Sequence, residues 1–204
     1  MKSVIAYTLA FLGILSLEAV AQHGNHGIEK EALKAEAIHA DHSLYHLDSE
    51  FVDHRNNLVQ LSDFQGEPVI VVLFYGNCTQ VCPILIQDTW KLFSSLDESA
   101  QAKTNVLAVS FDTENDTPEV LKEYAEYEQL DLPEWHFITG KHTDIKMLAT
   151  MMGVKYQQTS DGHFAHSNLV TVLDTEGKIA KRVEGLNQSM DEAVDIIEAM
   201  LKNM

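Results

Sequence analysis

Hydrophobic residues along the chain form short unbroken runs that alternate with longer segments of helical spacing. The clearest run covers residues 69–75 (VIVVLFY). A run without polar alternation is typical of a strand buried on both faces, as in a parallel sheet covered by helices. Comparable runs lie at residues 106–111, 135–138, 168–173 and 179–183. The turn residues DTEG at 174–177 predict that the last two runs form a hairpin.

The longer segments between these runs have the spacing of amphipathic helices. Two of them open with proline at the first helical position, Pro83 and Pro118, where the missing N–H has no partner to lose. Thr117 is expected to cap the second of these helices, and Gly153 is expected to end a later one. The predicted helices cover residues 83–96, a segment that begins at 118, residues 142–152 and residues 189–201.

Ahead of the first long run, residues 44–47 and 51–61 suggest a short hairpin that turns at residues 53–57. The complete order is then a β-hairpin, strand, helix, strand, helix, strand, helix, two strands and a last helix. This alternation predicts an α/β layered domain, which we place at residues 43–204, and the sequence has no internal repeat.

The N-terminal segment has a different composition from this domain. Residues 1–21 have the features of a signal peptide: a basic residue, an apolar run at 4–17 and an Ala-Val-Ala cleavage motif. The apolar run is shorter than the roughly 20 residues that a membrane span needs. We therefore expect cleavage and export to the periplasm or a comparable compartment. An uncleaved signal anchor is the alternative, and it would be the protein's only contact with a membrane. Residues 22–42 form a polar, histidine-bearing arm with helical spacing at 28–39.

The charge balance limits the possible partners. The chain carries 31 acidic and 14 basic side chains, for a formal net charge of -17. Such a field repels phosphate backbones, so nucleic acid is not expected to bind. Cations and basic protein surfaces would be attracted instead.

Cys78 and Cys82 are the only cysteines, and export would place them in an oxidising compartment. A disulfide between them would close too small a loop to add much stability, because the entropic benefit grows with loop length. Redox chemistry or metal binding therefore explains the pair better. Both cysteines lie between a predicted buried strand and a helix, at the carboxyl end of the sheet, where α/β folds commonly bind ligands. The partial positive charge of the helix N-terminus is expected to lower the pKa of Cys82.

A third ligand could come from a distant part of the chain. Two soft thiolates on one turn suit Cu(I), and an added imidazole would accommodate Cu(II) as well. His166 lies just before the run at 168–173, and it could reach the cysteines if that strand neighbours the strand at 69–75. His163 is expected to face solvent.

The order of these motifs resembles that of the SCO/SenC family. The resemblance covers the chain from about residue 43 to the C-terminus and rests on Cys78-x-x-x-Cys82-Pro after a strand, SFD at 110–112, DTP at 116–118, WHFITG at 135–140, and His166-Ser ahead of LDTEG at 173–177. It implies a thioredoxin-like fold with copper bound by Cys78, Cys82 and His166. It also implies delivery of copper to the dinuclear copper centre of a cytochrome c oxidase, or maintenance of its thiols. Many members carry Pro-Asp where this chain has Thr79-Gln80, so a carboxylate is missing beside the site.

The first hypothesis is therefore a metallochaperone that passes copper to the copper-site subunit of an oxidase, or to another copper protein, by ligand exchange. It predicts an exposed, mobile cysteine loop. The alternative is a thiol–disulfide oxidoreductase with Cys78 and Cys82 as its redox-active disulfide. Such enzymes normally have CxxC spacing and a proline before the strand that faces the pair, whereas no proline follows Pro133 here. A peroxidase is disfavoured, because no activating arginine or tryptophan–glutamine set is evident near Cys78.

Several other potential ligands have simpler structural explanations. They are His39, His42 and His46; Met147, Met151 and Met152; and Asp112 and Asp116. The three histidines have the spacing of one helix face, but histidine-rich tracts bind metals weakly without fixed geometry, so a second metal site there is the less favoured hypothesis. The methionines have the spacing of core residues. The two aspartates are expected in a turn and a helix cap.

Overall fold

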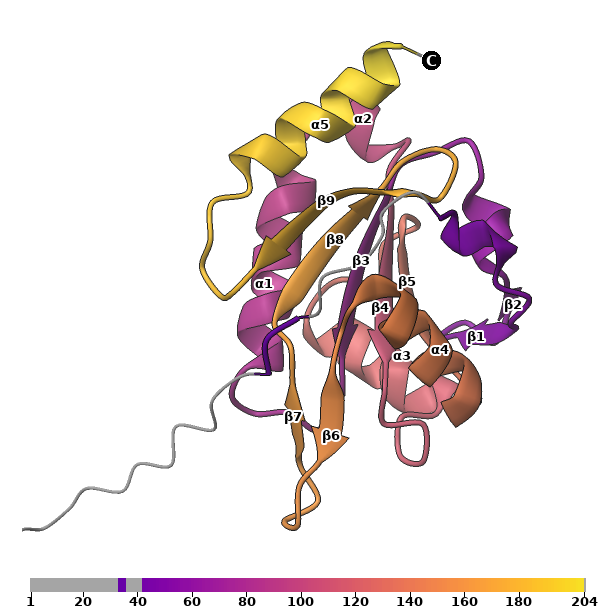
Figure 1. The fold of residues 1–204 in the computed structure, drawn as a ribbon, viewed down its shortest axis with the longest axis vertical. Coiled ribbons are helices and arrows are strands. Elements are labelled where there is room, and N and C mark those ends of the chain that lie inside the picture. The colour runs from indigo at the N-terminus through magenta and orange to yellow at the C-terminus, as the bar shows by residue number, and fades with distance from the viewer. Residues whose placement is uncertain (1–32, 36–41, 204) are drawn as a thin grey trace, which may run out of the picture.

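A computed structural model describes residues 33–35 and 42–203, and its centre is a seven-stranded mixed sheet flanked by helices (Figure 1). The sheet order is β2-β1-β5-β4-β3-β8-β9. Its strands are β1 (Phe51–Asp53), β2 (Leu58–Val59), β3 (Val69–Phe74), β4 (Asn105–Ser110), β5 (Trp135–Gly140), β8 (Leu169–Leu173) and β9 (Ile179–Glu184). A separate two-stranded sheet pairs β6 (Tyr156–Gln158) with β7 (Phe164–His166). The predicted α/β layered domain is thus confirmed.

Strand β3 is an interior strand of the sheet, and every one of its residues is buried. It pairs in parallel with β4 on one side and antiparallel with β8 on the other. The unbroken apolar sequence of β3 and β4 therefore matches their position between helices on both faces. Strands β8 and β9 form the expected antiparallel hairpin.

Four of the five helices lie where their sequence signals indicated, with ends that differ from the prediction by no more than two residues. They are α1 (Cys82–Ser94), α2 (Glu98–Gln101), α3 (Pro118–Tyr127), α4 (His142–Met152) and α5 (Asp191–Lys202). The Thr117 side chain accepts a hydrogen bond from the Val120 amide and so caps α3, while Gly153 ends α4 in the left-handed conformation with φ 72°. Helices α1 and α5 lie side by side in Figure 1, with α1 packed on β3 and β8 and α5 on β9.

Aromatic side chains show which helices share a face of the sheet. Trp135 contacts Trp90 of α1, and Phe137 contacts Tyr124 of α3. Because residues two apart on a strand point to the same face, α1 and α3 cover one face of β5. The site described below lies at the end of the sheet where β3 leads into α1.

Several short strands and helices were predicted wrongly or were not predicted. Residues 44–47 are not a strand: Leu44–His46 form a 3₁₀ helix, which starts where the Ser43 hydroxyl accepts a hydrogen bond from the Tyr45 amide. The hairpin is confirmed only for β1 and β2, whose turn is held by the Asp53 carboxylate. Strands β6 and β7, helix α2 and the 3₁₀ helix Leu61–Phe64 were not predicted, because three or four residues carry too little periodicity to register.

The predictions for the N-terminal segment concern residues that lie largely outside the described part of the chain. Residues 1–21 are outside it entirely, and the arm at 22–42 is described only at 33–35 and 42. Residues 33–35 are not helical, so the helix expected at 28–39 is wrong for those three positions. The Ala35 amide instead donates to Glu184 Oε1 of β9 at 2.9 Å. Within the described ranges, no helix has the length and apolarity needed to cross a membrane.

His54, in the turn after β1, should make the stability of the domain depend on pH. It is 1% exposed, its Nδ1 accepts from the Phe137 amide at 3.2 Å, and its Nε2–H donates to Asp131 Oδ1 at 3.1 Å. This arrangement requires the neutral ring, and burial lowers the pKa of His54. The unfolded chain then binds the proton more readily, so the free energy of unfolding should fall as pH decreases below about 6.5 towards the lower folded pKa.

Thermal melts between about pH 5 and pH 8 would check this dependence. The variant His54→Asn should flatten the profile without abolishing the slope, because burial also lowers the pKa of His136. His46→Asn, at an exposed histidine, serves as the control. A wild-type profile that is level over this range, or one unchanged in His54→Asn, would contradict the assignment.

Candidate metal centre

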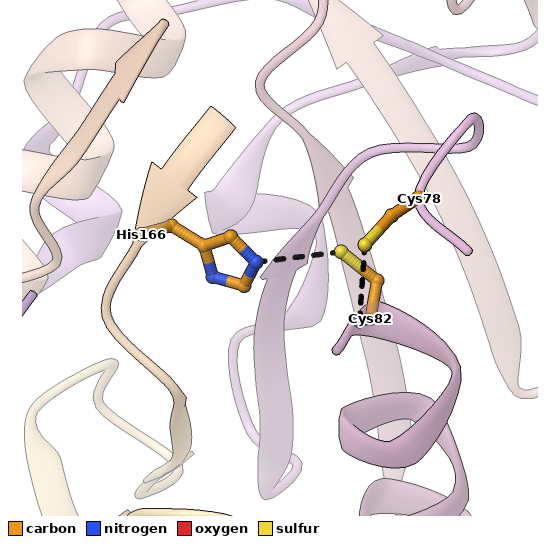
Figure 2. A group of neighbouring side chains, drawn as sticks. All are labelled: Cys78, Cys82 and His166. Atoms are coloured by element: carbon orange, nitrogen blue, oxygen red, sulfur yellow. Dashed lines mark hydrogen bonds between the residues drawn. The ribbon is translucent and has the colours of Figure 1, made fainter. Parts of the chain in front are cut away.

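The two cysteines lie at the junction of β3 and α1. The chain leaves the sheet after Phe74, and the Cys78 amide donates to the Tyr75 carbonyl at 3.3 Å, which turns the backbone towards the helix. Cys82 is the first residue of α1. Its backbone N–H donates to Cys78 Sγ at 3.3 Å, so an N-terminal amide of the helix points at the other cysteine (Figure 2).

His166 reaches the cysteines from the opposite side. It ends β7, and β8 follows three residues later as the antiparallel neighbour of β3. The neighbouring strands that the hypothesis required are therefore present. Figure 2 shows the imidazole directed at Cys82, with Nε2 3.4 Å from Cys82 Sγ.

A backbone contact sets the orientation of the His166 ring. Its Nδ1 lies 3.0 Å from the Ser167 carbonyl oxygen. A carbonyl oxygen can only accept, so Nδ1 carries the hydrogen and Nε2 presents a lone pair to the cysteines. Histidines that bind metals are commonly held in this way by a hydrogen bond from their second nitrogen.

The three predicted ligands thus form one group. One donor atom from each of Cys78, Cys82 and His166 lies within 4.8 Å of the other two. A single ion at about 2.0–2.3 Å from each donor would need only a small contraction of this group. Within the described residues, this is the sole set of three or more His, Cys, Asp and Glu side chains with such spacing.

All three side chains are buried, with Cys78 9% exposed, Cys82 0% and His166 4%. The exposure predicted for the cysteine loop therefore does not extend to its two sulfurs. The exposed residues of the loop are its polar ones, Asn77, Thr79 and Gln80. At the third ligand, the rings of Tyr75 and Phe111 pack against the His166 imidazole.

The two thiols differ in acidity, and the lowered pKa predicted for Cys82 is wrong. The hydrogen bond from Cys82, supported by His166 and by the Cys82 and Gln80 amides, lowers the pKa of Cys78. Burial, together with the neighbouring Cys78, raises the pKa of Cys82. The helix N-terminus acts on Cys78 because the Cys82 amide points there, rather than at the sulfur of its own residue. Both residues are free thiols.

Asp116 supports the loop in a way that the sequence did not reveal. Its carboxylate is 2% exposed and accepts from the Gly76 amide at 2.8 Å and from the Ser110 hydroxyl. A Cβ atom on Gly76 would lie only 2.9 Å from Asp116 Oδ1, so glycine is required for this close approach. Burial raises the pKa of Asp116. Asp116 was expected in a turn or a helix cap. The one signal of its contact with the loop was Gly76, the glycine that follows the predicted strand at residues 69–75.

The remaining candidates do not join the group. Asp112 is the expected turn residue, with its carboxylate bound by the Asn115 side-chain amide. His39 lies outside the described residues, and His42 precedes the 3₁₀ helix that contains His46, so these two do not share one helix face. Met152 is buried and Met151 partly buried as predicted, but Met147 is 50% exposed and is not a core residue.

Comparisons with known proteins agree with this geometry. A family model described as SCO1/SenC matches residues 39–202. The SCO1 protein homolog of Bacillus subtilis (strain 168) is 23% identical over 145 residues, which cover 69% of this chain and 75% of that protein.

Two solved structures share the fold. Arabidopsis thaliana ScoI with copper bound superposes with a TM-score of 0.65 at 20% identity, over 76% of this chain and 97% of that one. BsSco, described as a member of the Sco family of cytochrome c oxidase assembly proteins with a disulfide switch, gives a TM-score of 0.68 at 21% identity, over 78% and 95%. The thioredoxin-like fold that the sequence resemblance implied is confirmed.

Proposed function

Because this chain belongs to the SCO1/SenC family, we propose that it binds one copper ion through Cys78, Cys82 and His166 and delivers it to another copper protein. The observation that carries the proposal is the donor set, two sulfurs and an imidazole nitrogen within 4.8 Å of one another. Thiolates select soft ions such as Cu(I), and imidazole suits copper in either oxidation state. The nearby Asp116 carboxylate is engaged by Gly76 and Ser110, so the site offers little to Mg²⁺ or Ca²⁺, which prefer oxygen ligands.

The recipient in this proposal is the copper-site subunit of a cytochrome c oxidase. BsSco, which has the same fold, is described as belonging to a family of oxidase assembly proteins, and copper is bound in the ScoI structure from Arabidopsis. The signal-like residues 1–21 support action outside the cytoplasm, with residues 43–204 as the working domain.

Burial of the ligands determines how delivery would begin. Cys82 and His166 are less exposed than Cys78, so an incoming thiolate would meet the ion on the Cys78 side first. The partner would then displace the remaining ligands one at a time, without any change of oxidation state. The exposed residues Thr79 and Gln80 would have to move aside for this approach.

Titration of the fully reduced protein with Cu(I) against a competing chelator tests the binding step. We expect one ion per chain, bound more tightly than by the chelator, with His166→Ala weakening the affinity at least about tenfold, since even partners outside the ligand set cost 10–100-fold. His46→Ala, which removes an exposed histidine beside the β8–β9 turn, should change nothing. Binding that is no tighter than the chelator's, or that is indifferent to His166, would contradict copper binding at this site.

The differing acidity of the two thiols supports a second candidate function, a thiol–disulfide oxidoreductase. Cys78 has the lowered pKa and is the more exposed of the pair, as an attacking thiol should be, while Cys82 lies behind it as a resolving thiol. Exchange chemistry needs both sulfurs but not the imidazole as a metal ligand. Disulfide exchange that persists in His166→Ala, in a protein without Cu(I) affinity, would favour this enzyme.

A further inference from the structure

An open strand edge lies beside the metal centre, on the small sheet formed by β6 and β7. The turn that joins these strands carries His163, which is exposed as the sequence predicted. Strand β7 covers one edge of β6, and within the described residues no strand pairs with the other edge. Figure 1 shows β7 on one side of β6 and α4 on the other, so the free edge faces the part of the molecule that contains α4.

The hydrogen bonds of the β6–β7 pair show which backbone groups this free edge presents. The Lys155 carbonyl accepts from the Ser167 amide at 2.8 Å, and the Thr159 amide donates across the hairpin at 2.7 Å. Hydrogen-bonded and non-hydrogen-bonded pairs alternate along an antiparallel ladder, so the positions between these two bonds alternate as well. The N–H and C=O groups of Tyr156 and Gln158 therefore point away from β7.

The free edge borders a cavity of about 390 Å³. Its walls come from three parts of the chain: the loop that follows β4, one side of α4, and residues 153–158, which include β6. The rings of Phe111, Tyr156 and Phe164 line it, and those of Phe111 and Tyr156 stack with their centroids 4.9 Å apart. The volume lies in the range of ligand sites, and the aromatic lining suits a large apolar side chain.

Charged side chains of both signs line the same cavity. Lys146 and Lys155 lie among its lining residues together with Asp112 and Glu114. These two positive and two negative groups offset each other, so the cavity favours neither an anion nor a cation. Recognition is then left to the backbone groups of the strand edge and to the aromatic lining, which suits a neutral segment.

We propose that the free edge of β6 and the adjoining cavity bind an extended segment of a partner protein, which adds a strand to β6 and inserts one large apolar side chain against Phe111. Unpaired N–H and C=O groups of an edge strand are a template for a further strand, and proteins commonly bind extended peptides in this way. Because β6 has only three residues, the main-chain hydrogen bonds are few, and the inserted side chain supplies the rest of the affinity.

This surface would hold a partner next to the metal centre. Phe111 lines the cavity and also contacts the His166 imidazole, with the ring centroids 5.2 Å apart. Strand addition itself needs only the backbone of β6 and the lining of the cavity, so the proposal does not depend on copper binding.

Selection of random heptapeptides displayed on phage against the immobilised full chain tests the proposal. We expect the enriched peptides to carry apolar residues in the alternating pattern of a strand. Synthetic copies of an enriched peptide are then N-methylated at alternate backbone amides, in either of the two possible registers. Methylation in the register that faces β6 should weaken binding at least about tenfold, because it removes the hydrogen bonds to the edge, whereas the other register should have little effect.

Two protein variants locate the bound peptide. Gln158→Pro removes an N–H that points away from β7 and no ladder hydrogen bond, so it should weaken binding at least about fivefold while the hairpin stays paired. Thr150→Trp fills the cavity from α4 and should weaken binding at least about tenfold. Thr143→Trp is the matched control, since Thr143 is exposed on the same helix and does not line the cavity. Thermal unfolding checks that each variant folds.

The opposite outcomes each contradict the proposal. If no peptide is enriched, the edge binds no extended segment. Equal binding by both N-methylated forms would mean that side chains alone are recognised and that no strand is added. Binding that is unchanged in Gln158→Pro and in Thr150→Trp would place the peptide elsewhere on the chain. None of these measurements involves copper, so their result is separate from the test of the proposed function.

Discussion

Replacing Cys82 with serine is expected to lower the affinity for Cu(I) by more than about 100-fold, beyond the loss usual for groups outside the ligand set. Cys82 is the ligand that contacts both of the others: its amide bonds Cys78 Sγ, and its sulfur lies 3.4 Å from His166 Nε2. Without its sulfur, only the Cys78 thiolate and the His166 imidazole remain as donors. A neutral hydroxyl is a poor substitute, because Cu(I) prefers soft thiolates.

The same substitution should leave the fold intact. Serine is similar in shape, and its hydroxyl can still donate to His166 Nε2, so the fully buried position keeps its hydrogen bond. Competition with a chelator measures the affinity, and thermal unfolding checks the fold. Thr79→Ser is the matched control, since Thr79 is exposed in the same loop between the cysteines. An affinity within tenfold of wild type would exclude Cys82 as a ligand.

Asp116→Ala is expected to destabilise the protein by about 2–4 kcal/mol, because it leaves the Gly76 amide and the Ser110 hydroxyl without their buried acceptor. The loop that begins at Gly76 carries Cys78, so Cu(I) binding should weaken as well, by about 10–100-fold. Chemical denaturation and the same chelator competition measure the two effects.

Asp116→Asn provides the control for this prediction. Both hydrogen bonds are accepted by Oδ2, so an asparagine whose carbonyl oxygen occupies that position retains them. Since burial raises the pKa of Asp116, replacing the carboxylate by a neutral amide also relieves an unfavourable charge. The stability of this variant should lie within about 1 kcal/mol of wild type. Equal losses in the alanine and asparagine variants would mean that the charge, and not the hydrogen bonding, supports the loop.

The parts of the fold that could be predicted are those that local chemistry specifies. Strand β3 could be predicted because an apolar run of that length is buried on both faces of a sheet. Helix α3 could be predicted because Thr117 provides its N-cap and Pro118 its first residue. Strands β6 and β7 were missed, since each has three residues and pairs with nothing but the other. Their existence depends on tertiary contacts that no local pattern encodes.

The ligand set could be predicted from order and resemblance, but its environment could not. Whether Cys78 and Cys82 are exposed depends on how the rest of the domain packs around them, which their own loop sequence does not contain. The order of their pKa values depends on the hydrogen bond between the two sulfurs and on the burial of Cys82, both of which arise only in the folded chain. The role of Asp116 depends on its meeting Gly76 from forty positions away.

The pairing of β6 and β7 outside the main sheet has an evolutionary consequence. In Figure 1 the hairpin extends beyond the sheet, and its strands share no register with the seven central ones. Insertions or deletions in the turn at 159–163 can therefore accumulate without shifting any core strand. The cysteines, in contrast, are tied to β3 and α1, where a change of length would displace buried residues. Selection can thus vary what surrounds the third ligand in descendants of this protein while the remainder of the domain stays the same.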